Sequence, residues 1–341
     1  MASNKLTDHK YLIFDVYGTL ADWETGLYNA LLPLLSRFRS SSQWSRTEAI
    51  QAFLSVESDI QAQHPSMLYS DLLAKAHEVL EARLSAGEGG SAMDNGATTL
   101  EGNPTTSSAA QDQEGESSTL TPQTISSPDA HTAFGNSIKE WAPFPDSSEA
   151  LHRLSKHFHL IVLSNVDHAS FAHTHAYLSE GSTPASSGYD REAPALYRRP
   201  SPNTHPIDLW LPRRTPNSNS PFSLILTAQD TGSYKPALTG FLAAFEAIRS
   251  EPILLATPGE SRDSASATPT IDDIKSKTLC VAQSLTHDHK PAKQLGVRSV
   301  WIDRQGAALR PSDADEYGWK WRFETLGDMA SAVEKELPDI A

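Results

Sequence analysis

Residues 11–20 read YLIFDVYGTL: an apolar run ends at Asp15, and a turn around Gly18 follows. A short run of β-branched and aromatic residues is typical of a buried parallel strand. Ligands of open α/β sheets bind at the carboxyl ends of the strands. The pattern therefore predicts a strand that carries the Asp15 carboxylate to a binding crevice. The alternative is that Asp15 only caps the turn, with its oxygens bound to the amides around Gly18.

The composition limits the kind of protein. The 341 residues have a formal net charge of −14, and no basic block offsets it, which argues against a nucleic-acid partner. The first residues lack the apolar core of a signal peptide, and no run is long enough to span a membrane. The single cysteine, Cys280, excludes an internal disulfide and lies in an apolar run, so we expect a buried thiol. We expect a soluble cytoplasmic protein with a small-molecule substrate.

Three stretches are rich in small polar residues and proline and poor in large apolar ones: residues 85–133, 179–221 and 257–270. Such segments bury too little apolar surface to offset the chain entropy lost on folding. We interpret them as disordered insertions. In the second, Tyr197 and Trp210 belong to short apolar patches that we expect to dock on the body of the protein.

The rest of the chain alternates predicted strands with predicted helices. The strand candidates are residues 11–15, 160–164, 223–226, 278–282 and 299–303, and helical patterns cover residues 147–157, 237–250 and 290–295. This alternation predicts an α/β fold with a doubly wound parallel sheet.

Between the first two strands the pattern is helical only. Residues 25–38 and 67–84 have apolar positions at helical spacing, and Ser45 with Glu48 forms a capping-box signature ahead of a further helix. We expect a helical domain of residues 22–142 inserted into a core of residues 1–21 and 143–341. Placed over the strand ends, it would exclude water from them.

Polar residues end or follow three other predicted strands. Ser164 and Asn165 close the run LIVLSN, although such a pair is also a common helix N-cap. Lys235 lies in SYKP at residues 233–236; a lysine before a helix is usually solvated, but a buried one would offset two neighbouring carboxylates.

The run QSLTHDH at residues 283–289 follows the fourth predicted strand. Its Asp288 is the second acid of the predicted crevice. The alternative interpretation is a metal site made by His287 and His289, although three consecutive residues rarely converge on one ion.

These four stretches resemble the motifs of the haloacid dehalogenase superfamily, in the superfamily's order. The resemblance covers about residues 11–304 apart from the insertions. Tyr17, two residues after Asp15, makes the chain similar to the type II 2-haloacid dehalogenases, because the superfamily's phosphatases usually carry a second Asp there. The resemblance implies a Rossmann-like core with an inserted helical cap domain.

The resemblance also implies roles for particular residues. Asp15 would be the nucleophile, Lys235 would keep it ionised, and Asp288 would hold or activate water. Substrate-binding roles would fall to Tyr17, Thr19, Ser164, Asn165 and Ser284. No metal ligand and no cofactor are expected, and an apolar face on the cap helices would permit a homodimer.

The arginines differ from the pattern of the type II dehalogenases. Type II dehalogenases typically place an arginine early in the cap to receive the halide, whereas residues 22–36 contain none. Arg37 or Arg39 is the candidate to replace it from a shifted helix. Arg304, which follows the last predicted strand, is expected to form a surface salt bridge.

Three functions follow from these residues. The first is hydrolysis of a short 2-haloacid to the 2-hydroxyacid through an aspartyl ester on Asp15. The second is a Mg²⁺-dependent phosphatase that uses Asp15, Ser164, Lys235 and Asp288; Tyr17 argues against it, because a phenol is a poor general acid at neutral pH. The third is a catalytically weak binding or scaffold protein, which the missing cap arginine and the long polar insertions would allow.

Overall fold

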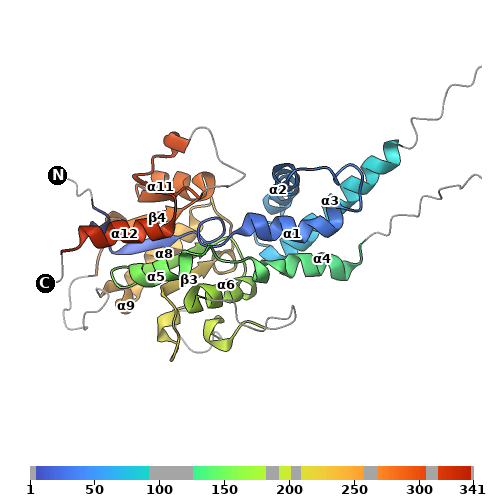
Figure 1. The fold of residues 1–341 in the computed structure, drawn as a ribbon. Helices are drawn as coiled ribbons and strands as arrows, with labels where there is room; N and C mark the ends of the chain where they lie inside the picture. Colours follow the sequence, from blue (N-terminus) through green and yellow to red (C-terminus); the bar gives the residue numbers. More distant parts are fainter. Residues whose placement is uncertain are drawn as a thin grey trace, which may run out of the picture.

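The computed structural model describes residues 5–91, 126–181, 192–200, 209–256, 268–304 and 314–338. Within these ranges the centre is a six-stranded sheet in the order β3-β2-β1-β4-β5-β6, and every neighbouring pair is parallel. The strands are β1 (Tyr11–Phe14), β2 (His159–Ser164), β3 (Phe222–Thr227), β4 (Thr278–Ala282), β5 (Arg298–Ile302) and β6 (Trp321–Phe323). The predicted doubly wound parallel α/β fold is confirmed (Figure 1).

Helices cover both faces of the sheet. Leu12 and Phe14 of β1 pack into an apolar cluster with α5 (Ser147–Leu154), α6 (His168–Glu180) and α12 (Leu326–Glu336). Tyr11 and Ile13 pack on the opposite face with α8 (Thr239–Ser250), α9 (Pro252–Leu255), α10 (Ile271–Ser276) and α11 (Lys290–Gln294). A short helix, α7 (Ala228–Thr231), follows β3 directly. Because both faces are covered, β1, β2 and β4 consist mostly of apolar residues, which gives them a clear sequence pattern.

The strand order changes direction at β1, which lies between β2 and β4. Phe14, the last residue of β1, pairs with Val162 and with Val281. The residues that follow these strands therefore emerge side by side at one edge of the sheet. In open α/β sheets such a switch point is where ligands bind. Cys280 of β4 is fully buried, as predicted.

Between β1 and α5 the chain forms a separate group of helices, the helical insertion. Its members are α1 (Trp23–Leu35), α2 (Arg46–Gln63), α3 (Tyr69–Ser91) and α4 (Pro128–Gly135). They have an apolar core of their own that includes Leu31, Phe53 and Leu73. The capping box of Ser45 and Glu48 at the start of α2 is confirmed. Figure 1 shows these helices extending away from the sheet on one side.

The two connections between the helical insertion and the sheet run side by side. Ala21 and Pro143 form an antiparallel bridge. The Asp22 amide donates to Ala142 O at 2.8 Å, and the Phe144 amide donates to Leu20 O at 2.9 Å. We call this pair of segments the connecting ribbon.

Ordered structure reaches further into the predicted insertions than we expected. In the first, α3 continues to Ser91, because helix propagation tolerates polar residues once a helix has formed. The separate helix α4 begins at Pro128, where Ser127 caps it by accepting from the Ala130 amide. In the second, Tyr197 and Trp210 are buried against the body as predicted. In the third, Thr270 caps α10. The remainder of these predictions, residues 92–125, 182–191, 201–208 and 257–267, lies outside the described residues.

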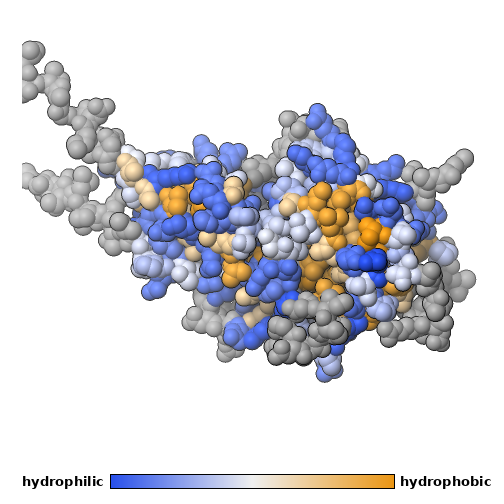
Figure 2. Space-filling view, turned by 180° about the vertical axis from the view of Figure 1, so that it is seen from behind, coloured by the Kyte–Doolittle hydropathy of each residue, from blue (hydrophilic) through white to orange (hydrophobic). Residues whose placement is uncertain are grey.

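The surface of the described residues is mixed in polarity. Figure 2 shows a largely hydrophilic face with separate apolar areas over the helical insertion and over the sheet unit. The large apolar side chains with the greatest exposure are Leu32, Leu68, Leu196, Leu242 and Ile253. Within the described ranges, no helix has both the length and the hydropathy needed to cross a membrane. The homodimer stays a prediction.

Gly26 of α1 lies directly against the ring of Trp141. A Cβ at this position would come within 2.1 Å of the indole Cδ1. We expect Gly26→Ala to lower the free energy of unfolding by about 1–3 kcal/mol, because overpacking outweighs the better helix propensity of alanine. Urea denaturation measures the difference.

The matched control is Gly87→Ala in α3, where an added Cβ meets nothing within 4 Å. This variant should gain roughly 0.5–1 kcal/mol from helix propensity alone. Equal gains at the two positions would show that Trp141 is not held against α1.

Candidate active site

A cavity of about 440 Å³ lies between the strand ends and the helical insertion. Its sheet side is lined by Asp15, Tyr17, Asn165, Val166, Lys235, Gln283, Ser284, Leu285, Thr286, His287, Asp288 and Trp301. Its helical side is lined by Trp23, Glu24, Leu54, Glu57, Ser58, Gln61, Tyr69 and Trp141. The cavity therefore brings together polar side chains that are far apart in the sequence.

Asp15 lies immediately after β1, and its amide donates to Val281 O at 3.1 Å. Gly18, with φ of +97°, allows the chain to turn back so that the Thr19 hydroxyl donates to Asp15 Oδ2 at 2.6 Å. The Gln283 amide in turn donates to Thr19 Oγ1 at 2.8 Å. The Asp15 carboxylate, 7% exposed, is thus held in a fixed orientation by side chains and is more than the cap of a turn.

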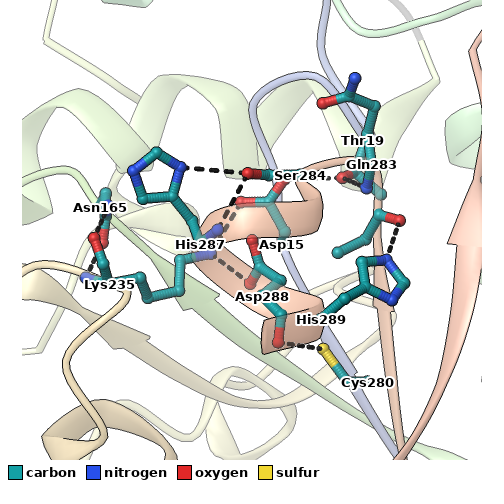
Figure 3. Close-up of polar contacts among 11 residues, drawn as sticks. Asp15, Thr19, Asn165, Lys235, Cys280, Gln283, Ser284, His287, Asp288 and His289 are labelled. Carbon is teal, nitrogen blue, oxygen red and sulfur yellow. Dashed lines mark hydrogen bonds and ion pairs between the residues drawn. The ribbon is translucent and has the colours of Figure 1, made fainter. Parts of the chain in front are cut away.

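Lys235 lies between two carboxylates. Its Nζ donates to Asp15 Oδ1 and to Asp288 Oδ1, both at 2.8 Å (Figure 3). Burial on its own would lower the pKa of Lys235, but the charges of Asp15 and Asp288 outweigh it and raise that pKa above its ordinary value. Lys235 is therefore a buried, permanently charged cation, not the solvated surface lysine that its sequence context also allowed.

Asp288 belongs to a single π-helical turn, Leu285–His289, that follows β4. Its Oδ2 atom is buried and has no hydrogen-bond partner among the described residues. Burial raises the pKa of Asp288 to about 7, Asp15 adds to the rise, and Lys235 opposes it. Two buried acids share one cation here, so a proton on one acid is favoured near neutral pH.

Asn165 uses both ends of its side-chain amide on the backbone of Lys235. The Lys235 amide donates to Asn165 Oδ1 at 2.7 Å, and Asn165 Nδ2 donates to Lys235 O at 3.1 Å. This geometry favours a positioning role for Asn165. Ser164 does not line the cavity, and its buried hydroxyl has no partner among the described residues.

Ser284 and the histidines around Asp288 hold the π-helical turn. The His287 amide donates to Ser284 Oγ at 3.3 Å, so Ser284 caps the turn as well as lining the cavity. The ring nitrogens of His289 pair with Ser299 Oγ at 2.8 Å and Ala282 O at 3.0 Å. Because both nitrogens of His289 are engaged, the interpretation of His287 and His289 as a metal pair does not fit the geometry.

Tyr17 forms part of the cavity wall. Its hydroxyl lies 2.8 Å from Thr174 Oγ1, and its ring packs edge-on to Trp141 with the ring centroids 5.5 Å apart. Burial holds the pKa of Tyr17 well above its ordinary value, so the phenol stays neutral.

Comparison with solved structures establishes the fold. A defluorinating L-2-haloacid dehalogenase, Rha0230, superposes with a TM-score of 0.52 over 98% of this chain and 100% of its own, at 12% sequence identity. The chain has the haloacid dehalogenase fold. The L-2-haloacid dehalogenase of Xanthobacter autotrophicus gives a TM-score of 0.50 with the same coverage and identity. The HAD-fold protein YfnB of Bacillus subtilis, bound to magnesium, gives 0.50 over 96% of this chain and 99% of its own, at 13% identity.

No protein-family model matches the chain, and no curated protein matches it in sequence. The expectation of the haloacid dehalogenase fold, drawn from four short stretches of sequence, is confirmed by structure. The sequence similarity of these neighbours is too low to transfer an activity.

The positions of three arginines in this structure differ from those expected from the sequence. Arg304 forms a salt bridge as expected, with Asp146 at 2.6 Å, but its side chain is buried and not at the surface. Its Nε and Nη2 also donate to Thr19 O at 3.0 and 2.8 Å, so it orients the turn after β1. Arg37 pairs with Glu81 at 2.8 Å inside the helical insertion. Neither Arg37 nor Arg39 lines the cavity, so neither replaces a halide-binding arginine in this structure.

Proposed function

We propose that this protein is a hydrolase that works through an aspartyl ester on Asp15 and cleaves the carbon–halogen bond of a short 2-haloacid. The observation that carries the proposal is the position of Lys235 Nζ, 2.8 Å from both Asp15 and Asp288. This cation keeps the Asp15 carboxylate ionised as a nucleophile. It bonds only Oδ1 of Asp288, so Oδ2 of Asp288 remains available to act on water. The choice of a 2-haloacid as substrate is based on Tyr17 and on the resemblance of the motifs to those of the type II dehalogenases.

In the first step a carboxylate oxygen of Asp15 attacks C2 of the substrate. A C–O bond forms, the carbon–halogen bond breaks, and the halide leaves with the electron pair, so the configuration at C2 is inverted. A weakly hydrated, oriented carboxylate is required for such an attack. Thr19 and Lys235 provide the orientation, and burial provides the low hydration.

In the second step water attacks the ester carbon that belongs to Asp15. Asp288 Oδ2, which has no partner among the described residues, accepts the proton of this water. The bond between the Asp15 carboxyl carbon and the ester oxygen then breaks, Asp288 returns the proton to that oxygen, and the 2-hydroxyacid leaves. The Asp15 carboxyl group that remains loses its proton to solvent. Lys235 and Thr19 stabilise the negative charge that develops on the other oxygen.

The helical insertion supports the same proposal as a cap. It supplies one side of the cavity and keeps the strand ends from bulk water. Exclusion of water strengthens the interactions of Lys235 with the two carboxylates. It also protects the ester from water molecules other than the one that Asp288 deprotonates.

A Mg²⁺-dependent phosphatase is the second candidate, favoured by the unpartnered Asp288 Oδ2. The other residues fit a metal poorly. Lys235 already bonds one oxygen of each acid, and no group of three or more His, Cys, Asp or Glu side chains suited to a metal occurs in the described part of the chain. Tyr17 replaces the second Asp that the phosphatases usually carry. The residues of this cavity therefore favour chemistry without a bound metal.

The decisive test measures halide release from the two enantiomers of 2-chloropropionate, with and without EDTA, against an Asp15→Asn control. We expect release that is insensitive to EDTA and absent in Asp15→Asn. A single turnover in ¹⁸O-labelled water should place label in Asp15. Label found only in the product would overturn the aspartyl-ester route, and Mg²⁺-dependent release of phosphate from small esters would favour the second candidate.

The pH dependence follows from Asp288. A base must be ionised to accept a proton, and burial raises the pKa of Asp288 to about 7. We therefore expect kcat to rise with pH through about 7, to level off above it, and to fall about tenfold per pH unit well below it. A pH–rate profile at saturating substrate checks this.

Glu57 is the control for this profile, because its carboxyl lies in the same cavity and burial raises its pKa to about 7 as well. The inflection should persist in Glu57→Gln. A profile that is flat from pH 5 to 9 only in Glu57→Gln would assign the titration to Glu57 and not to Asp288.

A further inference from the structure

One face of α2 forms the wall opposite the strand ends. Leu54, Glu57, Ser58 and Gln61 recur at helical spacing and all line the cavity. Glu24, at the start of α1, adds a second carboxylate to this wall. Of the described residues that line the cavity, Lys235 is the one lysine or arginine, and it is engaged with Asp15 and Asp288. The wall is therefore acidic, where a receptor for an anion would need positive charge.

The two glutamates of this wall differ in their surroundings. Arg46 lies 3.7 Å from Glu24, which offsets the charge of that carboxylate. Glu57 is 9% exposed, and the described residues supply it with a hydrogen bond from Tyr69 and no cation. A buried carboxylate without a cation disfavours the folded state. A group of this kind at a cavity wall is a candidate for ligand recognition.

The chemistry of a carboxylate fixes what it can recognise. An ionised carboxylate accepts hydrogen bonds and donates none, and Tyr69 uses part of its capacity. A cationic donor such as an ammonium group would offset the charge that the protein leaves uncompensated. A carboxylate or phosphate facing Glu57 would instead be repelled.

The size of the cavity leaves room for such a group. At about 440 Å³ it lies within the range of about 300–1,000 Å³ typical of small-molecule sites and exceeds the needs of a three-carbon acid. A longer substrate can place its reacting carbon at Asp15 and its other end at α2.

We propose that Glu57 is a specificity residue that selects substrates with an ammonium group at the end remote from the reacting carbon. This inference rests on the proposed function, since it places the reacting carbon at Asp15. The substrate class is then a 2-halo acid with a cationic side chain, whose carboxylate lies on the Lys235 side and whose ammonium group lies on the α2 side.

The test uses two ligands of equal length in the reaction and two in binding. Halide release from 2-chloro-6-aminohexanoate is compared with release from 2-chloroheptanoate. Calorimetry on the Asp15→Asn variant compares the corresponding 2-hydroxyacids. We expect the amine to be preferred by about tenfold or more in kcat/KM and in affinity, because a charge-assisted bond is among the stronger contacts of a buried site.

Glu57→Gln should bring both preferences close to one, whereas Ser58→Ala, the next lining position on α2, should leave the ratios unchanged. Equal affinity for the amine and methyl ligands in the parent protein would overturn the inference, and so would a preference that survives Glu57→Gln. Because binding is measured without turnover, an amine preference in calorimetry supports the inference even if no halogenated compound reacts. Asp15-dependent turnover without any preference would keep the proposed function and reject the role of Glu57.

Discussion

Replacement of Asp288 by Asn is expected to trap the enzyme as an ester on Asp15. The first step needs only an ionised Asp15, so each molecule should release about one halide and then stop. Loss of a general base lowers the rate of the second step by about 10²–10⁴-fold. Intact-protein mass spectrometry would show the added 1-carboxyalkyl group, and peptide mapping would place this ester on Asp15.

The matched control is Asp167→Asn. Asp167 is also buried, but it does not line the cavity; its Oδ1 caps α6 by accepting from the Ser170 amide, and its Oδ2 accepts from the Ser70 amide of the helical insertion. Asparagine retains an acceptor for this cap. The control should continue to release halide beyond the first equivalent and should not accumulate the ester. Unchanged turnover in Asp288→Asn would remove Asp288 from the mechanism.

Replacement of Lys235 by Met is expected to produce the largest loss of stability. The change leaves Asp15 and Asp288 buried next to each other without a cation. Removing one partner of a buried ion pair costs about 3–5 kcal/mol. The deficit should be greatest above pH 8, where Asp288 has lost its proton, and smaller near pH 5, where Asp288 takes up a proton. Urea denaturation at the two pH values measures it.

A second variant separates this effect from a general failure to pack. In Lys235→Met/Asp288→Asn one of the two negative charges is gone as well. A double-mutant cycle should therefore show recovery of a large part of the lost stability at pH 8. If the double variant lost at least as much free energy of unfolding as the two single variants lose together, the charges would not be coupled through Lys235.

The central strands, and the polar residues at their carboxyl ends, could be predicted because both depend on short stretches of sequence. β1, β2 and β4 are buried on both faces, so each reads as an apolar run that ends at a polar residue. β6 could not be predicted in the same way, since Trp321–Phe323 is three residues long and only partly buried. Short edge strands form through pairing with a neighbour and leave little pattern of their own.

The residues of the candidate site also differ in how far the sequence could predict them. Asp15, Lys235 and Asp288 could be singled out because each follows or precedes an element with a clear pattern. Glu57 could not, because the choice of the α2 face that meets the cavity depends on how the helices dock on the sheet. Arg304 was misjudged for a related reason: its burial depends on Thr19 O, a backbone atom contributed by a distant turn.

The connecting ribbon has a consequence for how the helical insertion can move relative to the sheet unit. Apart from this covalent attachment, the helical insertion meets the sheet unit through hydrogen bonds such as the Ser70 amide to Asp167 Oδ2 at 3.0 Å and Tyr234 Oη to Met67 O at 2.5 Å. Tyr17 and Tyr234 of the sheet unit also pack against the apolar core of the helical insertion. Exchanging these two bonds for water costs about 1–3 kcal/mol, and separating the apolar contacts adds to that cost. A rotation about the ribbon would break these contacts between the two parts while every strand pair of the sheet remained intact.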